Sequence, residues 1–251
     1  MFKDFSIVDG ICSLDLSSWD DFYKLYYKNM TIFKGYIWRG QKDANWKLES
    51  TIDRLLKDRG LDVKDEIDKH FNNFIFAARG RRNKNAVKLN NEDEWWALGQ
   101  HNGLSTPLLD WTTSPFVAAF FAFNKGSEDD TLKRGVFALH QESIIEKSNS
   151  LEEEGIKFIK PFSDENARLV NQSGLFTRTP VGIDIESWVK KNYKGVSDQI
   201  VLLKITLPNN QRETCLKILN SMNINYLTLF PDLYGASRYC NMIVKIRNYC
   251  N

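Results

Sequence analysis

The chain has 251 residues, 42% of them hydrophobic and 13% aromatic, which is enough to bury one large core or two modest ones. Its 34 Lys and Arg against 32 Asp and Glu give a formal net charge of +2, so bulk charge argues neither for nor against a nucleic-acid partner. No apolar run approaches the roughly 18 residues of a membrane helix, and the N-terminus lacks a signal-peptide pattern. We therefore expect a soluble, cytoplasmic protein without a membrane partner. The lack of a linker rich in Pro, Gly or Ser favours a single domain over residues 1–251.

The four cysteines form no CxxC motif and have no histidine nearby. Neither a metal site nor a disulfide framework is therefore predicted. Cys12, Cys215, Cys240 and Cys250 are expected to be reduced thiols in the core or on the surface.

Four helices and one strand are predicted in the first hundred residues. Ser18, Ser50 and Asp62 are good N-cap residues, each followed by a helical pattern. Alternation in the segment FKGYIWR predicts a strand instead. The helices are expected at 19–28, 51–57, 63–82 and 91–100, and the strand at 33–39.

Arg39 ends the more apolar face of the predicted strand, which it shares with Phe33, Gly35 and Ile37. Burying an unpaired charge is costly, so this arginine needs a partner. One interpretation is a salt bridge to an acidic residue of the same domain. The other is an anion clamp, since a guanidinium group matches phosphate geometry with two hydrogen bonds.

The segment GQHNGLSTPLLDWTTSPFVAAFFAFN, residues 99–124, carries polar groups directly before an apolar run. Ser114 and Pro115 are an N-cap and a first-turn proline, and the run 116–123 without a polar stripe predicts a helix buried on all sides. Its N-terminus, with unpaired N–H groups and a positive dipole end, would lie beside Asp110, Thr112 and Thr113. This arrangement is typical of a site for an anionic or polar ligand, although the two threonines also fit as capping hydroxyls.

Three further polar residues have alternative interpretations. Asp110 lies in apolar company between Leu109 and Trp111, so it is held by backbone hydrogen bonds or it is functional. His101 precedes a turn, where packing explains it as well as ligand binding does. Asp232 follows Pro231, where a helix dipole alone favours an acid.

The second half predicts strands at 135–140, 175–178 and 200–207. A short helix before the second strand would place Arg168 and Gln172 on one face, toward the same cleft as Arg39. The few, widely separated strands do not alternate strictly with helices. This favours an α+β fold, a single mixed domain with a small, split central β-sheet flanked by helices. Further helices are expected at 183–191, at 210–222, and from Pro231 through Arg247.

The motifs YIWRGQ, HNGLSTPLLDWTTSPFVAAFFAF, ARLVNQSGLFT and LFPDLYGASRY occur in this order along the chain. Together they resemble the FRG domain family, which is named for a Phe/aromatic-Arg-Gly strand end. The resemblance covers about residues 32–239, and so most of the chain.

A looser resemblance links the aromatic-Arg-Gly strand and the Ser/Thr-rich turn to the ADP-ribosyltransferase superfamily, and it implies a fold of that type. It implies that Arg39 holds the pyrophosphate or ribose of NAD. Gly40 would let the backbone approach the nicotinamide amide. Thr112, Thr113 and Ser114 would stand for the Ser/Thr motif that orders the pocket.

The third element of that superfamily is a glutamate on a later strand, which binds a ribose hydroxyl and stabilises an oxocarbenium-like transition state. Gln172 stands at this place in the order of motifs. A neutral amide can hold a hydroxyl but supplies no negative charge opposite a developing cation. Asp110 and Asp232 are the candidate carboxylates, and His101 is a further candidate for the NAD pocket.

These expectations combine into an NAD-dependent enzyme that transfers ADP-ribose to a macromolecular acceptor, protein or nucleic acid, or hydrolyses NAD. Such a protein would suit an intracellular bacterial toxin or an anti-phage effector. A non-catalytic nucleotide or nucleic-acid sensor that uses the same Arg39 cleft is the alternative. A scaffold whose polar motif only caps and packs is the third hypothesis, and the oligomeric state stays open.

Overall fold

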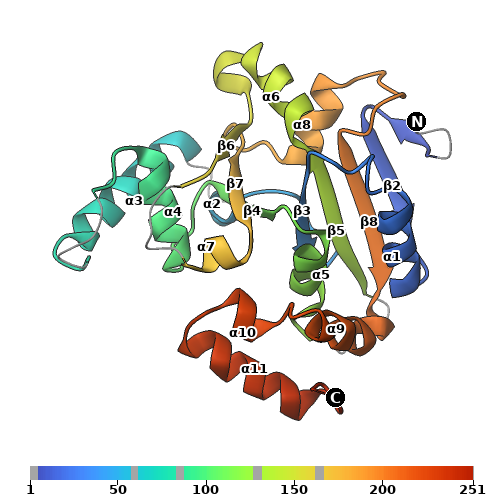
Figure 1. Cartoon of the computed structure of the whole chain (residues 1–251). Coiled ribbons are helices and arrows are strands. Elements are labelled where there is room, and N and C mark those ends of the chain that lie inside the picture. The colour runs from blue at the N-terminus through green and yellow to red at the C-terminus, as the bar shows by residue number, and fades with distance from the viewer. Residues whose placement is uncertain (1–4, 58–61, 83–87, 127–131, 162–166, 251) are drawn as a thin grey trace.

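The computed structural model describes residues 5–57, 62–82, 88–126, 132–161 and 167–250 (Figure 1). Eight strands form one mixed, open sheet in the order β1-β2-β8-β5-β3-β4-β7-β6. Neighbouring strands are antiparallel except β2 and β8, which run parallel. The strands are β1 (Ile7–Val8), β2 (Ile11–Asp15), β3 (Tyr36–Gln41), β4 (Leu108–Thr112), β5 (Lys133–His140), β6 (Lys157–Ile159), β7 (Gly174–Arg178) and β8 (Leu202–Pro208).

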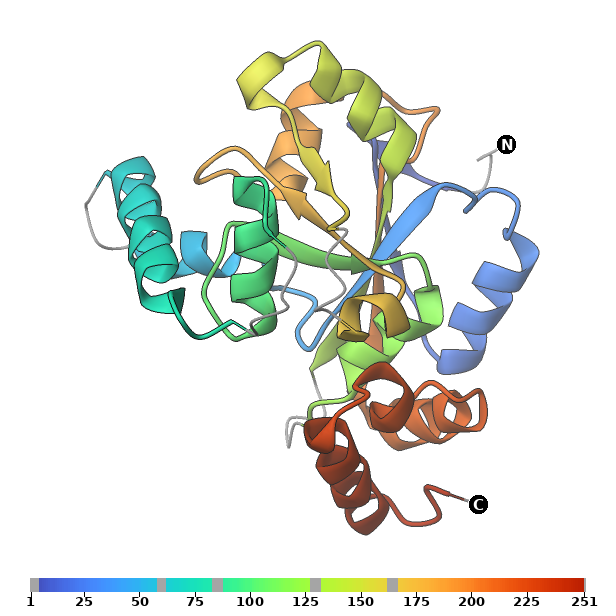
Figure 2. The ribbon, with the colours of Figure 1, turned by 60° about the vertical axis from the view of Figure 1, so that its left-hand side comes forward.

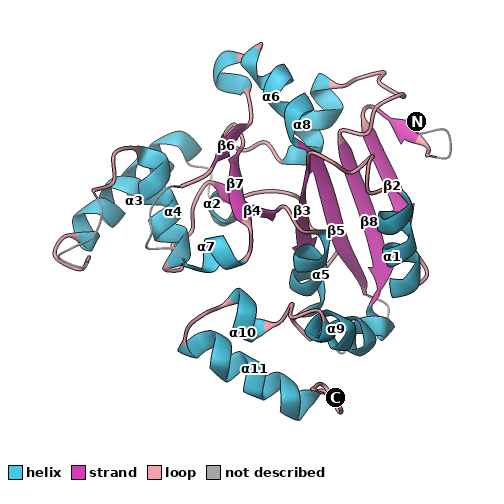
Figure 3. Cartoon of the chain, viewed as in Figure 1, coloured by secondary structure: helices cyan, strands magenta, loops and turns pink. Residues whose placement is uncertain are grey.

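The sheet is narrowest between β3 and β4, which pair at Trp38 and Thr112 alone. Figure 3 shows β4, β6 and β7 beside the long strands β3, β5 and β8. The α+β class is confirmed. The prediction of a small, split sheet is wrong, because eight strands are joined in one sheet. The short strands β1, β2 and β4 show no clear alternation of apolar and polar residues, so they were not predicted.

Helices cover the sheet and its ends (Figures 1 and 2). α2, α3 and α4 gather beside β4, whereas α9, α10 and α11 form a C-terminal group. The helices of the described residues are α1 (Trp19–Lys28), α2 (Thr51–Leu56), α3 (Val63–Ala78), α4 (Glu92–His101), α5 (Pro115–Phe123), α6 (Gln141–Asn149), α7 (Ala167–Asn171), α8 (Ile185–Asn192), α9 (Arg212–Ser221), α10 (Tyr226–Leu229) and α11 (Leu233–Lys245). Two 3₁₀ turns are η1 (Glu152–Glu154) and η2 (Asn209–Gln211).

The predicted N-caps are confirmed. The side chains of Ser18, Ser50 and Asp62 each accept a hydrogen bond from a backbone N–H in the first turn of α1, α2 and α3. α6 was not predicted, and its N-cap position makes no side-chain capping hydrogen bond.

The β3 strand begins and ends later than the predicted 33–39. Gly35 takes a positive φ of 85°, which places a turn before Tyr36, and pairing with β5 extends the strand to Gln41. Both faces of the strand are buried, since Ile37 and Trp38 expose 1% and 2% of their surface. Arg39 therefore emerges from a strand that lies within the core.

α5 is the buried helix that the sequence predicts, and it packs directly on β3. Ala118, Ala119 and Phe120 are fully buried, while Phe121 is half-buried. A Cβ atom on Gly40 would lie 1.8 Å from the carbonyl oxygen of Ala118. The close contact between β3 and α5 thus requires a glycine at this position.

Two arginines, the buried Arg134 and the half-buried Arg212, hold the C-terminal end of α5. Arg134 donates from Nη1 to the Ala122 carbonyl at 3.1 Å, and Arg212 donates from Nε to the Phe123 carbonyl at 2.8 Å. Burial and the neighbouring Arg212 lower the pKa of Arg134 to about 10. Cations stabilise the negative end of a helix dipole, so this end of α5 is well anchored.

All four cysteines are free, as predicted: Cys12 and Cys215 are buried, and Cys240 and Cys250 are exposed. Among the described residues, no helix is long and apolar enough to cross a membrane.

Candidate ligand-binding site

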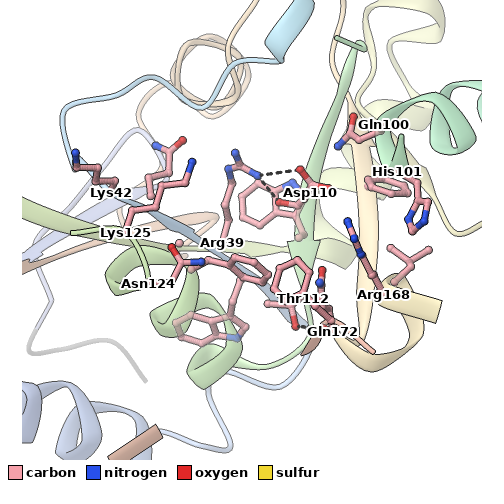
Figure 4. Close-up of a pocket in the computed structure, with 18 of the residues that line it drawn as sticks. Arg39, Lys42, Gln100, His101, Asp110, Thr112, Asn124, Lys125, Arg168 and Gln172 are labelled. Carbon is pink, nitrogen blue, oxygen red and sulfur yellow. Dashed lines mark hydrogen bonds and ion pairs between the residues drawn. The ribbon is translucent and has the colours of Figure 1, made fainter. Parts of the chain in front are cut away.

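A cavity of about 460 Å³ lies where β3, β4 and α5 meet α7 and the C-terminal helices (Figure 4). Its volume is in the range of small-molecule sites. We call it the Arg39 cavity, and it is lined by Trp38, Arg39, Gly40, Gln41, Lys42, Trp46, Arg54, Gln100, His101, Asp110, Trp111, Thr112, Phe121, Asn124, Lys125, Arg168, Leu169, Gln172, Phe176, Tyr226, Phe230, Tyr234 and Arg238.

The lining is strongly basic. Among the described lining residues, one side chain is acidic, that of Asp110. Six are basic, namely Arg39, Lys42, Arg54, Lys125, Arg168 and Arg238. This local excess is hidden in a chain whose net charge is +2, and it favours an anionic ligand.

Arg39 reaches from β3 toward β4. Its Nη1 donates to the main-chain carbonyl of Asp110 at 2.7 Å and lies 3.7 Å from the Asp110 carboxylate. Burial lowers the pKa of Arg39, and the Asp110 carboxylate offsets part of this effect. The Nε atom of Arg39 is buried and has no hydrogen-bond partner among the described residues. The acidic partner that one sequence interpretation expects is therefore present, whereas the other interpretation, an anion clamp, stays a prediction.

Asn124 supplies a second buried atom without a partner. It is 7% exposed, and its Oδ1 accepts no hydrogen bond from a described residue. The residue directly follows α5, where Arg212 also donates to the Asn124 carbonyl at 3.4 Å. A buried polar atom without a partner typically costs about 1–3 kcal/mol, so a ligand that pairs with it would recover this energy.

Asp110 lies on β4, a strand that was not predicted from the sequence. Its side chain is 64% exposed and lines the cavity. Thr112, at the end of the same strand, is buried, donates to the Gln172 carbonyl at 2.6 Å and accepts from the Ser114 N–H at 3.1 Å. Thr112 therefore joins β4 to the end of α7.

The Ser/Thr motif does not gather in the cavity. Thr113 has an exposed side chain, and its N–H donates to the Ser173 carbonyl at 3.1 Å. Ser114 caps α5 by accepting from the Val117 N–H at 3.3 Å. Of the three residues, Thr112 alone lines the Arg39 cavity within the described part of the chain.

Arg168 and Gln172 both line the cavity, as their shared helical face predicts. Gln172 donates from Nε2 to the Leu229 carbonyl at 3.0 Å. Arg168 lies over the rings of Phe230 and Tyr234, at 5.4 and 5.3 Å from their centroids. These contacts join α7 to the C-terminal helices across the cavity.

Asp232 does not line the cavity. It caps α11 by accepting from the Gly235 N–H at 2.9 Å, and it pairs with Arg168 at 2.5 Å. The Gly235 N–H, followed by Arg168, lowers the pKa of this carboxyl. The interpretation of Asp232 as a helix-capping acid is therefore supported by the structure.

His101 and Gly40 both line the cavity. His101 is half-buried at the end of α4. Gly40 has a packing reason of its own, the contact with α5 described above, which is separate from any approach to a ligand.

Several lining residues were not identified from the sequence. Lys42 and Trp46 lie in the polar turn after β3, and Asn124 and Lys125 directly follow the apolar run. The available signal was a basic and aromatic turn next to the Arg-Gly pair. Tyr234 and Arg238 belong to the LFPDLYGASRY motif, but no local signal placed them at the Arg39 cleft, because long-range packing brings them there.

The FRG domain model matches residues 34–131. This confirms the predicted FRG domain over residues 34–131, whereas the resemblance was expected over about residues 32–239. The matched part contains β3, β4, α5, Arg39 and Asp110. A search of curated proteins and a search of solved structures each returned no match.

Proposed function

We propose that the Arg39 cavity binds NAD and that the protein is an NAD-consuming enzyme of the ADP-ribosyltransferase type. The observation that carries this proposal is Arg39 itself, whose guanidinium group lines a cavity in which the described residues include six basic side chains, Arg39 among them, and one carboxylate. A phosphate oxygen is the acceptor that suits it, because it pairs with the donor and compensates the charge.

The aromatic end of the cavity supports a ligand with flat rings. Tyr226, Phe230 and Tyr234 line it together, and the first two rings lie 5.5 Å apart between centroids. Aromatic side chains and convergent polar groups are the usual lining of a nucleotide pocket. The adenine or the nicotinamide of NAD would lie at this end while the pyrophosphate lies at Arg39.

Asp110 is the carboxylate that we assign to the reaction. In this proposal the C–N bond between the ribose and the nicotinamide breaks, and nicotinamide leaves with the bonding electrons. The anomeric carbon forms a new bond to the oxygen or nitrogen of an acceptor, or to water. The acceptor's proton passes to Asp110 or to solvent. The exposed Asp110 carboxylate, which lines the cavity, is better placed for this than Asp232, which does not line it.

A second candidate function is nucleotide binding without reaction. The observation that favours it is Gln172, a neutral amide whose Nε2 is already engaged by the Leu229 carbonyl. In that case the same cavity would sense a nucleotide and leave it intact.

Nicotinamide release and calorimetric NAD binding separate these functions. We expect the wild type to bind NAD and release nicotinamide, and Arg39→Ala to do neither while keeping its circular dichroism spectrum. The matched control is Arg178→Ala, which removes an arginine that pairs with Glu92 at 2.9 Å outside the cavity.

Each outcome has a distinct meaning. Saturable binding without release would support the sensor. Absence of binding by the folded wild type would overturn the NAD proposal. If Arg39→Ala then lowered only the melting temperature, the scaffold hypothesis would remain.

An enzyme that consumes NAD would act as a toxin or an anti-phage effector by depleting NAD in the cytoplasm. The test is induced expression in a bacterial host. Growth should stop and cellular NAD should fall with the wild type, but not with Arg39→Ala expressed at the same level.

A further inference from the structure

One exposed tryptophan and three basic side chains are among the residues that line the Arg39 cavity. We call this group the Trp46 patch, and it consists of Lys42, Trp46, Arg54 and Lys125, all of which line the cavity. The Trp46 side chain is 52% exposed. Figure 4 shows Lys42 and Lys125 toward one end of the cavity and Arg168 toward the other. An exposed indole ring in a basic cavity offers a face on which a flat ring can stack.

The turn that carries Trp46 is fixed in place. Gln41 is 4% exposed and donates from Nε2 to the Trp46 carbonyl at 3.0 Å. The Trp46 N–H donates to the Asp43 carbonyl at 3.2 Å, and the Ala44 N–H donates to the Lys133 carbonyl at 2.8 Å. These hydrogen bonds fix the main chain of the turn, so the Trp46 side chain extends from an ordered backbone.

The three cations of the patch have no carboxylate partner among the described residues. Arg54 donates to the Glu49 carbonyl and to the Thr51 hydroxyl, which are both neutral groups. The acidic neighbours in sequence are engaged elsewhere, since Asp43 accepts from the Asn45 N–H and Asp53 accepts from Ser50. The positive charge of the patch is thus available to an external anion.

The charge of the cavity exceeds what NAD would neutralise. NAD carries two phosphate groups, whereas six basic side chains line the cavity against one carboxylate. The ion pair with Asp232 neutralises Arg168, and the remaining basic side chains still exceed the two phosphate groups of NAD. A second anionic group therefore fits at the Trp46 patch.

We propose that the Trp46 patch binds single-stranded nucleic acid, with a base stacked on Trp46 and phosphates held by Lys42, Arg54 and Lys125. Stacking on an exposed aromatic ring requires an unpaired base, which a single strand offers and a duplex does not. Trp46, Arg54 and Lys125 are exposed and come from three separate segments. Because these side chains are exposed, a bound nucleic-acid strand can continue past the cavity into solvent. The binding of a strand at the Trp46 patch does not depend on the proposed function. A role for this strand as the acceptor of ADP-ribose does rest on the proposed function.

Fluorescence anisotropy with labelled oligothymidylate of about 12 nucleotides, in the absence of NAD, tests the proposal. We expect Trp46→Ala to weaken binding about tenfold through loss of stacking. With about three phosphate contacts, log affinity should fall with log salt concentration at a slope near −2. The double variant Lys42→Ala with Lys125→Ala removes two of these contacts and should make the slope less steep by about 1.4. A duplex of equal length should bind more weakly than the single strand.

Two control variants match these changes outside the cavity. Lys34→Ala with Lys157→Ala removes the same charge from exposed positions, and Tyr27→Ala removes an aromatic ring that is 67% exposed. Neither should change the affinity by more than about twofold. No binding by the wild type, an unaffected Trp46→Ala variant, or equal losses in the controls would overturn the proposal.

Failure here is distinguishable from failure of the proposed function. Nicotinamide release without strand binding would remove this inference and leave the NAD enzyme in place. Strand binding without NAD binding would do the reverse. If both hold, labelled NAD should transfer its label to the oligonucleotide, and Trp46→Ala should reduce this transfer more than it reduces NAD hydrolysis.

Discussion

Arg39 and Asp110 form a two-part contact across the narrow junction between β3 and β4. The arginine Nη1 donates to the Asp110 carbonyl at 2.7 Å and lies 3.7 Å from its carboxylate. The main-chain bond fixes the direction of the guanidinium group, while the longer ion pair leaves the Asp110 side chain exposed. Arg39 is thereby oriented by the backbone, and the Asp110 carboxylate still faces the cavity.

The first prediction concerns the shape of the Arg39 side chain. Arg39→Lys keeps the positive charge but loses the planar set of donors, so it cannot donate to the Asp110 carbonyl and to a phosphate in the same geometry. We expect NAD affinity to fall roughly 10- to 100-fold, which corresponds to one charged hydrogen bond. Isothermal titration calorimetry measures this change. An unchanged affinity would show that charge alone suffices at this position.

The second prediction distinguishes the two carboxylates. Asp110→Asn should retain NAD binding, because the main-chain carbonyl still orients Arg39, but should lower nicotinamide release by about 100-fold or more. Asp232→Asn should leave release within about twofold, because Asn also serves as an N-cap for α11. Steady-state release by both variants is the measurement. The opposite pattern would move the catalytic role to Asp232.

Local signals in the sequence predicted much of the helical structure. α1 and α5 follow N-cap residues and uniform or periodic apolar patterns, and their bounds agree with prediction to within one residue. These signals depend on neighbours within a few turns, so they are readable without the fold. The Arg-Gly pair likewise indicated a ligand site through the cost of burying Arg39.

The sheet and half of the cavity depend on contacts that no local pattern encodes. β4 was not predicted, because Asp110 interrupts its apolar run, and its pairing with β7 makes it a strand. Trp46 and Tyr234 come to the cavity from segments almost two hundred residues apart. Ser114 fulfilled its local signal as a helix cap, which explains why it does not line the cavity.

The third prediction concerns Gly40. Its Cβ would lie 1.8 Å from the Ala118 carbonyl oxygen and 2.6 Å from the Ala122 nitrogen, so Gly40→Ala must push α5 away from β3. We expect a loss of several kcal/mol, or roughly 10 °C in melting temperature. Gly126→Ala is the control, because a Cβ there meets no described atom within 4 Å. Equal melting temperatures of both variants would contradict the close packing of β3 and α5.

The fourth prediction is a pH dependence at Asp184, the buried N-cap of α8. Burial raises the pKa of this carboxyl, but hydrogen bonds from Ser187 and the charge of Lys47 outweigh burial, so the pKa in the folded protein lies below the ordinary 3.8. A lowered pKa adds stability above the ordinary value, and this is lost as the pH falls through the folded value. Asp184→Asn should therefore cost about 1 kcal/mol at neutral pH and progressively less below pH 3.8.

Urea denaturation of both proteins at several pH values measures the Asp184 effect. A difference in unfolding free energy that stays constant into acid would show that the charge of Asp184 contributes nothing. Lys34→Ala provides a control, since this exposed lysine has no role in capping α8.

The fifth prediction places a carboxylate at the position where the ADP-ribosyltransferase resemblance expects one. Gln172→Glu would set negative charge opposite the reacting ribose, and we expect nicotinamide release to rise. The same change removes the donor to the Leu229 carbonyl at 3.0 Å and should lower stability by about 1–3 kcal/mol.

Gln172→Leu, which also loses this donor but adds no charge, controls for the loss of stability. We expect Gln172→Leu to be as destabilised as Gln172→Glu but less active than it. Gln172→Glu should therefore be the one variant of the two that combines lower stability with higher activity. If both variants lose activity equally, Gln172 serves to tie α7 to α10, and the negative charge needed by the reaction comes from Asp110.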